Sequence, residues 1–259
     1  MWIRVNDQRI FTISLVAMIA LCWLTLAIWG LSPYADYLSH EILEDLPGVF
    51  DQQYIMLLLI FTVGWALMIF AMMLPTSLPL IFMFQRMVKS RPNHSTLMAL
   101  VVAGYLAVWL LFGAAAHLGD LLIHNFVRQI GWLEANEWVI SAAIFAVAGI
   151  YQFTPLKYKC LEKCRSPLSF IVQHWRGKNE QRQAFQLGVH HGLFCLGCCW
   201  SLMLLMFAVS IGNMAWMLLL GMIMATEKNV PWGTKLSAPL GFTLLAFSVM
   251  LTVGELITL

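Results

Sequence analysis

Long apolar runs separated by short polar segments dominate the chain. Runs long enough to cross a bilayer occur near residues 10–31, 54–84, 96–116, 138–155, 190–210, 211–227 and 237–257. A spanning helix needs about 20 mostly apolar residues. The pattern therefore predicts an all-α, polytopic integral membrane protein with about seven transmembrane helices. The run at 211–227 is short, and a six-helix arrangement in which it is re-entrant is the main alternative.

The second run, 54–84, is too long for one straight span. At about 1.5 Å per residue it would extend some 45 Å, whereas the hydrocarbon core is roughly 30 Å thick. It contains Pro75 and Pro79. Proline cannot donate a backbone hydrogen bond, so Pro75 leaves the carbonyl of Ala71 without its helical partner. We expect this helix to be kinked, or broken with one end in the membrane interface.

Charged residues set the predicted orientation. Only 11% of residues are charged, against about 25% in soluble domains, and the net charge of +2 does not indicate nucleic-acid binding. Every Lys and Arg except Arg128 falls in four segments that seven helices place on one side. The positive-inside rule makes that side the cytoplasm. We expect one helical domain in the cytoplasmic membrane, with the N-terminus and the basic loop 156–189 inside, and the acidic loop 32–53 and the C-terminus outside.

The segment HHGLFCLGCCWSLM, residues 190–203, places soft metal ligands in a predicted membrane helix. His191, Cys195, Cys198 and Cys199 share an arc of roughly 100° on that helix. Cytoplasmic thiols stay reduced, and thiolates suit Cu(I), or zinc together with histidine. The alternative is that cysteine and glycine are simply small residues that allow close helix packing in lipid. Three cysteines within five residues, beside two histidines, favour a metal.

Other candidate ligands are expected at a similar depth. Cys160 and Cys164 follow the fourth helix at helical spacing, in a segment (151–167) that also suits an amphipathic interfacial helix. Met72 and Met73 lie in the inner half of the second helix. Adjacent residues of an α-helix cannot both face one neighbour, and methionine is a common core filler. We include both methionines as candidate copper ligands.

Glu227 is the acidic candidate of this inner group. It and Cys195 are equally far in sequence from Ile211, the expected apex of a tight hairpin, so they are predicted at equal depth. Ionisable groups near spanning segments usually have a partner. Glu227 is either a ligand or the partner of Lys228 or of the basic segment 157–165.

A second cluster of polar residues lies at the outer end of the third helix. His117, Asp120 and His124 fall within about 60° on a helix. Two histidines and a carboxylate suit copper, zinc or iron. A polar helix end at the water interface explains them equally simply, and we favour that interpretation.

Four motifs carry a resemblance to a known family. They are AMMLPTSLP, YQFTPLKYKCLEKCRSP, HGLFCLGCCWSLM and the Glu227–Lys228 pair, in this order along the chain. The chain resembles the domain of unknown function family numbered 2182, predicted metal-binding integral membrane proteins, over about residues 55–230. The resemblance implies several membrane helices and a metal site, with no established reaction.

Three functions fit these features. The first is a membrane protein that holds or passes a metal, copper or alternatively zinc, near the cytoplasmic leaflet. The second is an accessory subunit that packs on other membrane proteins. The third is a thiol redox enzyme, although adjacent cysteines such as Cys198 and Cys199 have unfavourable geometry for forming a disulfide with each other. No acyl-transfer triad, phosphate loop, dinucleotide fingerprint or haem attachment motif is present, so a non-enzymatic function is favoured.

Overall fold

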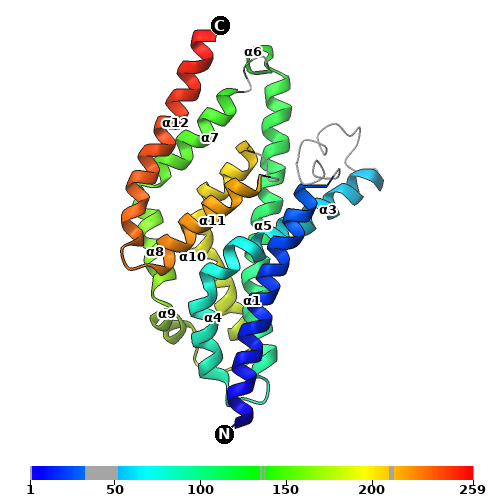
Figure 1. Cartoon of the computed structure of the whole chain (residues 1–259), viewed down its shortest axis with the longest axis vertical. Coiled ribbons are helices and arrows are strands. Elements are labelled where there is room, and N and C mark those ends of the chain that lie inside the picture. Colours follow the sequence, from blue (N-terminus) through cyan, green and yellow to red (C-terminus); the bar gives the residue numbers. More distant parts are fainter. Residues whose placement is uncertain (1, 33–51, 135, 137, 210–212, 259) are drawn as a thin grey trace.

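The computed structural model describes residues 2–32, 52–134, 136, 138–209 and 213–258, and its regular elements are all helical (Figure 1). The prediction of an all-α fold is confirmed for this part of the chain. The elements are α1 (Trp2–Gly30), α3 (Gln52–Met68), the π-helix η2 (Ile69–Met73), α4 (Leu74–Val88), α5 (His94–Arg128), α6 (Gly131–Glu134), α7 (Trp138–Tyr151), α8 (Pro155–Arg165), α9 (Pro167–His174), α10 (Glu180–Val209), α11 (Met214–Asn229), the 3-10 helix η3 (Gly233–Leu236) and α12 (Ser237–Thr258).

Several of these helices have the length and composition of membrane spans. Within the described residues five do so, or six if α7 and α8, which meet at 64°, form one bent span. The five are Ile13–Gly30, Leu58–Val88, His94–Arg128, Glu180–Met206 and Gly233–Glu255. Helix α11 has 16 residues and is not among them. Most of the acidic loop 32–53 and the expected hairpin apex at 210–212 lie outside the described residues.

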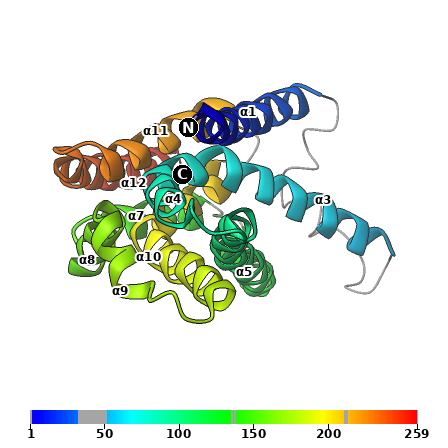
Figure 2. The same cartoon turned by 90° about the horizontal axis from the view of Figure 1, so that it is seen from below.

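The kink predicted from Pro75 takes the form of a π-helical turn. The run from α3 through η2 to α4 is continuous, and Figures 1 and 2 show α3 and α4 inclined to each other. The carbonyl of Ala71 accepts a hydrogen bond from Trp23 Nε1 of α1 at 3.0 Å. The carbonyl of Met73 accepts from Thr76 Oγ1 at 2.7 Å. Side chains thus satisfy two of the carbonyls at the bend, as the apolar interior of a membrane protein requires.

The basic segment 156–189, expected to connect two spans, is mostly helical. Helices α8 and α9 occupy its first half, and α10 begins at Glu180, well before the apolar run. Pro155 and Pro167 each stand in a first helical turn, where their missing N–H costs nothing. Thr154 caps α8 by accepting from the Lys157 backbone N–H. Lys and Arg lower hydropathy but remain good helix formers, so this basic segment is helical although its hydropathy is low.

Helix α10 is central to the bundle, and glycines bring its backbone against α5. Figure 2 shows α10 between α8 and α5. A Cβ added to Gly188 would lie 2.0 Å from the Val101 carbonyl oxygen, and one on Gly104 would lie 2.3 Å from that of Phe185. Small residues allow such close approach between membrane helices. This seam fixes which face of α10 is left for the remaining helices.

Substitution of Gly188 should test this seam. We expect Gly188→Ala to destabilise the protein by about 1–3 kcal/mol through overpacking, despite the higher helix propensity of alanine. Gly119→Ala on α5 is the matched control, because a Cβ there meets nothing within 4 Å. Thermal unfolding in mild detergent measures both. Equal melting temperatures for the two variants would contradict the close contact.

Candidate metal centre

Four candidate ligands recur every fourth residue along α10. His191, Cys195, Cys199 and Met203 are all buried, with at most 4% of each side chain exposed. Residues four apart share a face of a helix and rise about 6 Å per step. Cys198, next to this row, is also fully buried. Helix α10 therefore presents a continuous row of soft ligands to the core.

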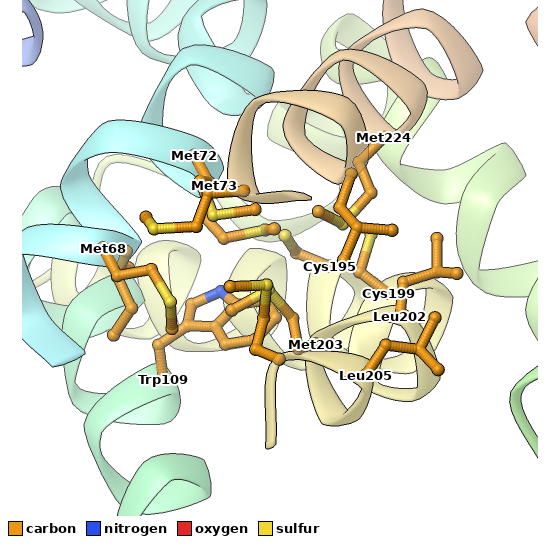
Figure 3. Close-up of a cluster of buried hydrophobic side chains, with 14 of the residues drawn as sticks. Met68, Met72, Met73, Trp109, Cys195, Cys199, Leu202, Met203, Leu205 and Met224 are labelled. Carbon is orange, nitrogen blue, oxygen red and sulfur yellow. The ribbon is translucent and has the colours of Figure 1, made fainter. Parts of the chain in front are cut away.

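Methionines from three other elements face this row across the core. Met68 of α3, Met72 and Met73 of η2 and Met224 of α11 are all buried in the same cluster of side chains as the α10 thiols (Figure 3). We expected that Met72 and Met73, being adjacent, could not both face the same neighbour. Both are buried in this cluster, so that expectation is corrected. The π-helical turn is wider than an α-turn, so successive side chains are separated by a smaller angle.

Cys195 contacts a buried lysine. The Lys228 Nζ atom, at the end of α11, lies 2.9 Å from Cys195 Sγ and donates to Thr76 Oγ1 at 3.1 Å. The Tyr105 hydroxyl oxygen lies 3.1 Å from the same sulfur. Lys228 is only 5% exposed. A buried ammonium is stable only with compensating partners, so the Cys195 sulfur is held as the acceptor of a cationic donor.

The other thiols lie around Cys198. Its Sγ is 3.4 Å from Cys199 Sγ and 4.0 Å from Cys164 Sγ on α8. Cys160, one turn earlier on α8, packs its sulfur against Gly197, where a Cβ would come within 2.5 Å of it. All these thiols are free. The fold thus gathers the five cysteines predicted near one membrane face.

Glu227 is occupied by an ion pair rather than directed at the thiols. Its Oε1 accepts from Lys157 Nζ and from Ser237 Oγ, each at 2.6 Å. Both members of the ion pair are buried, at 0% and 1% exposure. Lys157 also donates to the Gln152 side-chain oxygen. Among the open alternatives, this geometry favours the partner role over the ligand role.

His191 lies at one end of the row of ligands. Its Nε2 is 3.1 Å from Ser77 Oγ, and its ring stacks on Tyr105 with centroids 5.7 Å apart. Its Nδ1 is buried and has no hydrogen-bond partner in the described part of the chain. A buried imidazole nitrogen without a partner is a free donor for a metal ion.

The outer candidates are not assembled in the same way. The buried His117 ring lies 5.2 Å from that of Phe61, centroid to centroid, and Asp120 follows on the same helix. The His124 side chain lies outside the described residues. In the described chain no three His, Cys, Asp or Glu side chains converge as an ion would require. A metal in the inner cluster would therefore use methionine sulfur as well.

Three participants were missed by the sequence analysis. Met68 and Met203 complete the sulfur cluster, and Tyr105 contacts Cys195. A regular spacing of four residues links Met203 to the α10 thiols and Met68 to Met72. That regular spacing is the feature of the sequence from which both methionines could have been predicted. Nothing in the local sequence of Tyr105 indicates its contact with a cysteine from another helix.

Span-length helices surround a cluster of buried thiols and thioethers, the side chains that soft metal ions prefer. The comparison with known families is consistent with copper. The chain belongs to the PpoB2 copper chaperone family, whose model matches residues 62–251, well over half of the sequence. The expected kinship with metal-binding membrane proteins is thereby confirmed at the level of a copper-related family. No curated protein and no solved structure gives a significant match.

The matched region contains every candidate sulfur ligand of the inner cluster. Only α1, the acidic loop, the first turns of α3 and the C-terminal end of α12 fall outside it. The family match and the buried sulfur cluster therefore involve the same residues. Both point to the same part of the molecule.

Loss of one partner from the buried ion pair should be costly. We expect Glu227→Gln to destabilise the protein by about 3–5 kcal/mol, because Lys157 would remain buried without a counter-charge. Glu180→Gln is the control, since Glu180 pairs with Arg91 at the surface, where an ion pair contributes about 0–1 kcal/mol. Melting temperatures in detergent compare the two. A Glu227→Gln variant as stable as the control would contradict the structural role.

Proposed function

We propose that this protein holds Cu(I) in the buried thiol–thioether cluster and passes it to an acceptor near the cytoplasmic leaflet. One observation carries the proposal. Cys195 and Cys199 share a fully buried core with Met72, Met73 and Met224. Thiolates and thioethers are the ligands that Cu(I) prefers over harder divalent ions. Copper is thus the cargo of the protein.

Charge compensation supports thiolate binding at Cys195. Cu(I) carries one positive charge, which an apolar interior tolerates only with electrostatic compensation, and a thiolate supplies the strongest compensation. In the structure the Lys228 Nζ atom donates to Cys195 Sγ, where the ion would bind. Copper and the ammonium would compete for one sulfur. Copper binding would therefore displace the Lys228 Nζ atom from the sulfur by a small distance. The same Nζ atom also donates to Thr76 Oγ1, which remains available as its partner.

The free imidazole nitrogen of His191 gives the cluster a further donor on α10. It lies one helical turn from Cys195, on the side where α10 begins. Ligands of different strength along one helix allow an ion to be exchanged in steps rather than released at once. A chaperone needs this property, because it must give up the ion that it binds.

The proposed orientation places the cluster towards the cytoplasm. We extend the positive-inside argument to seven spans, with α11 as the short sixth span, an internal N-terminus and an external C-terminus. Basic α8, which carries Cys160 and Cys164, then lies at the inner face. Copper held by reduced thiols in this position would be accessible to cytoplasmic acceptors.

Copper content should depend on the two central thiols. Purified wild-type protein should bind stoichiometric Cu(I), and the double variant Cys195→Ser/Cys199→Ser should lose most of it, since serine keeps the size but not the soft sulfur. Elemental analysis after anaerobic loading measures the content. Cys22→Ser on α1 is the control, because Cys22 is a buried thiol at the α1 side of the same core and is not among the proposed ligands.

Two outcomes would contradict the proposal. Well-folded wild-type protein that takes up no copper would favour an accessory subunit, for which mild-detergent co-purification is the next test. A reversible dithiol titration without metal uptake would favour the redox enzyme. Serine is also accepted at helix contacts, so a double variant with unchanged copper would assign the cysteines to packing.

The orientation is tested by labelling introduced cysteines in intact cells. An impermeant maleimide should react with Ser39→Cys in the acidic loop and spare Lys178→Cys, an exposed position before α10. Permeabilisation should make Lys178→Cys reactive. The reverse pattern would overturn the orientation without affecting the copper site.

A further inference from the structure

The sulfur cluster extends beyond the thiols to a buried tryptophan. Trp109 of α5 is fully buried, and its Nε1 has no hydrogen-bond partner in the described chain. Its indole lies between Met68 and Met203 in the same core cluster (Figure 3). The backbone is held in place, because the Trp109 carbonyl accepts from Trp65 Nε1 at 3.0 Å. The indole ring also meets Phe112 edge to face, with centroids 5.8 Å apart.

This group has the chemistry of a weak site for a monovalent soft ion. Two thioethers offer soft, neutral ligands. They supply no negative charge, so the ion needs another source of electrostatic stabilisation in the apolar core. The face of an indole provides it, because tryptophan is the strongest aromatic partner for a cation. Methionine side chains are flexible enough to close on an ion without moving the helices.

The position of this group links it to the thiols. Met203 follows Cys199 by one helical step on α10, about 6 Å along the axis. Met68 precedes Met72 by the same step on the facing run. The group therefore lies beyond the thiols, on the side away from His191 and basic α8. An ion bound there would be adjacent to the thiol cluster and more weakly held than by it.

We propose that Met68, Met203 and the Trp109 indole form a second copper site, a thioether–indole station that exchanges Cu(I) with the thiol cluster. This inference rests on the proposed function, since it assigns a step to the same cargo. The ion keeps its oxidation state, and only its ligands change. Because its ligands are neutral, the station binds Cu(I) weakly. Copper bound there can therefore move to the thiolates, or be received from them, instead of staying in place.

Silver(I) is a suitable probe, because it is a soft monovalent ion that does not change oxidation state under these conditions. Full-length protein in detergent is titrated with Ag(I), and bound silver and tryptophan fluorescence are recorded together. Wild type should show a tight phase at the thiols, then a weaker phase with quenching. Trp109→Phe should abolish that quenching and weaken the second phase by about tenfold, as expected for loss of a buried cation–π contact.

The variant Met68→Leu/Met203→Leu should lose the second phase and retain the first. Leucine conserves volume, so packing should survive. Met222→Leu/Met250→Leu is the matched control, because both methionines are 60% exposed, and it should behave as wild type. If the double variant melts early, each single variant should weaken the second phase by itself.

The outcomes separate the two proposals. Absence of the tight phase from wild type would overturn the copper-holding function. A tight phase with no second phase, or a second phase that Met68→Leu/Met203→Leu leaves intact, would overturn the thioether–indole station alone. Quenching that persists in Trp109→Phe would also overturn it, because the signal would then come from another tryptophan.

Discussion

The buried ion pair between Lys157 and Glu227 is the interaction on which the arrangement of the site depends. It joins the start of α8 to the end of α11, and Ser237 of α12 binds the same carboxylate oxygen. Two buried charges are tolerated only when geometry and hydrogen bonds are complete, so the pair fixes the register of α11. Lys228 is the next residue. Once Glu227 is fixed on one side, Lys228 is directed to Cys195 on the other.

Features that follow from helix geometry alone could be predicted from the sequence. The rise per residue is constant in a helix. Depth arithmetic along a hairpin therefore placed Glu227 near Cys195, and its neighbour Lys228 does contact that thiol. Cys160 and Cys164 were expected near the same membrane face as the α10 thiols, and Cys164 Sγ lies 4.0 Å from Cys198 Sγ. The helical class followed from the apolar runs for a similar reason, because only helices and closed barrels satisfy the backbone inside lipid.

Other features depend on contacts that no local pattern encodes. Hydropathy treats Lys157 as one of several basic residues of a polar segment, whereas its Glu227 partner makes it fully buried. An assumed period of 3.6 residues cannot anticipate the π-turn that buries both Met72 and Met73. The position of the Trp109 indole between Met68 and Met203 (Figure 3) depends on three elements of the fold. Side-chain packing across helices decides such contacts, and one sequence without its relatives does not specify it.

The glycine seam between α5 and α10 also determines how the cluster can open. Cys195 and Cys199 are fully enclosed, so an ion reaches them only if a wall of the cluster moves. At Gly188 and Gly104 backbone meets backbone without intervening side chains, and a sliding movement there would produce immediate clashes. The wall formed by α5 and α10 is therefore the rigid side of the cluster. We therefore expect any opening movement in the facing wall of η2, α4 and α11, because a π-turn can shift along a helix by exchanging one hydrogen-bond acceptor for the next.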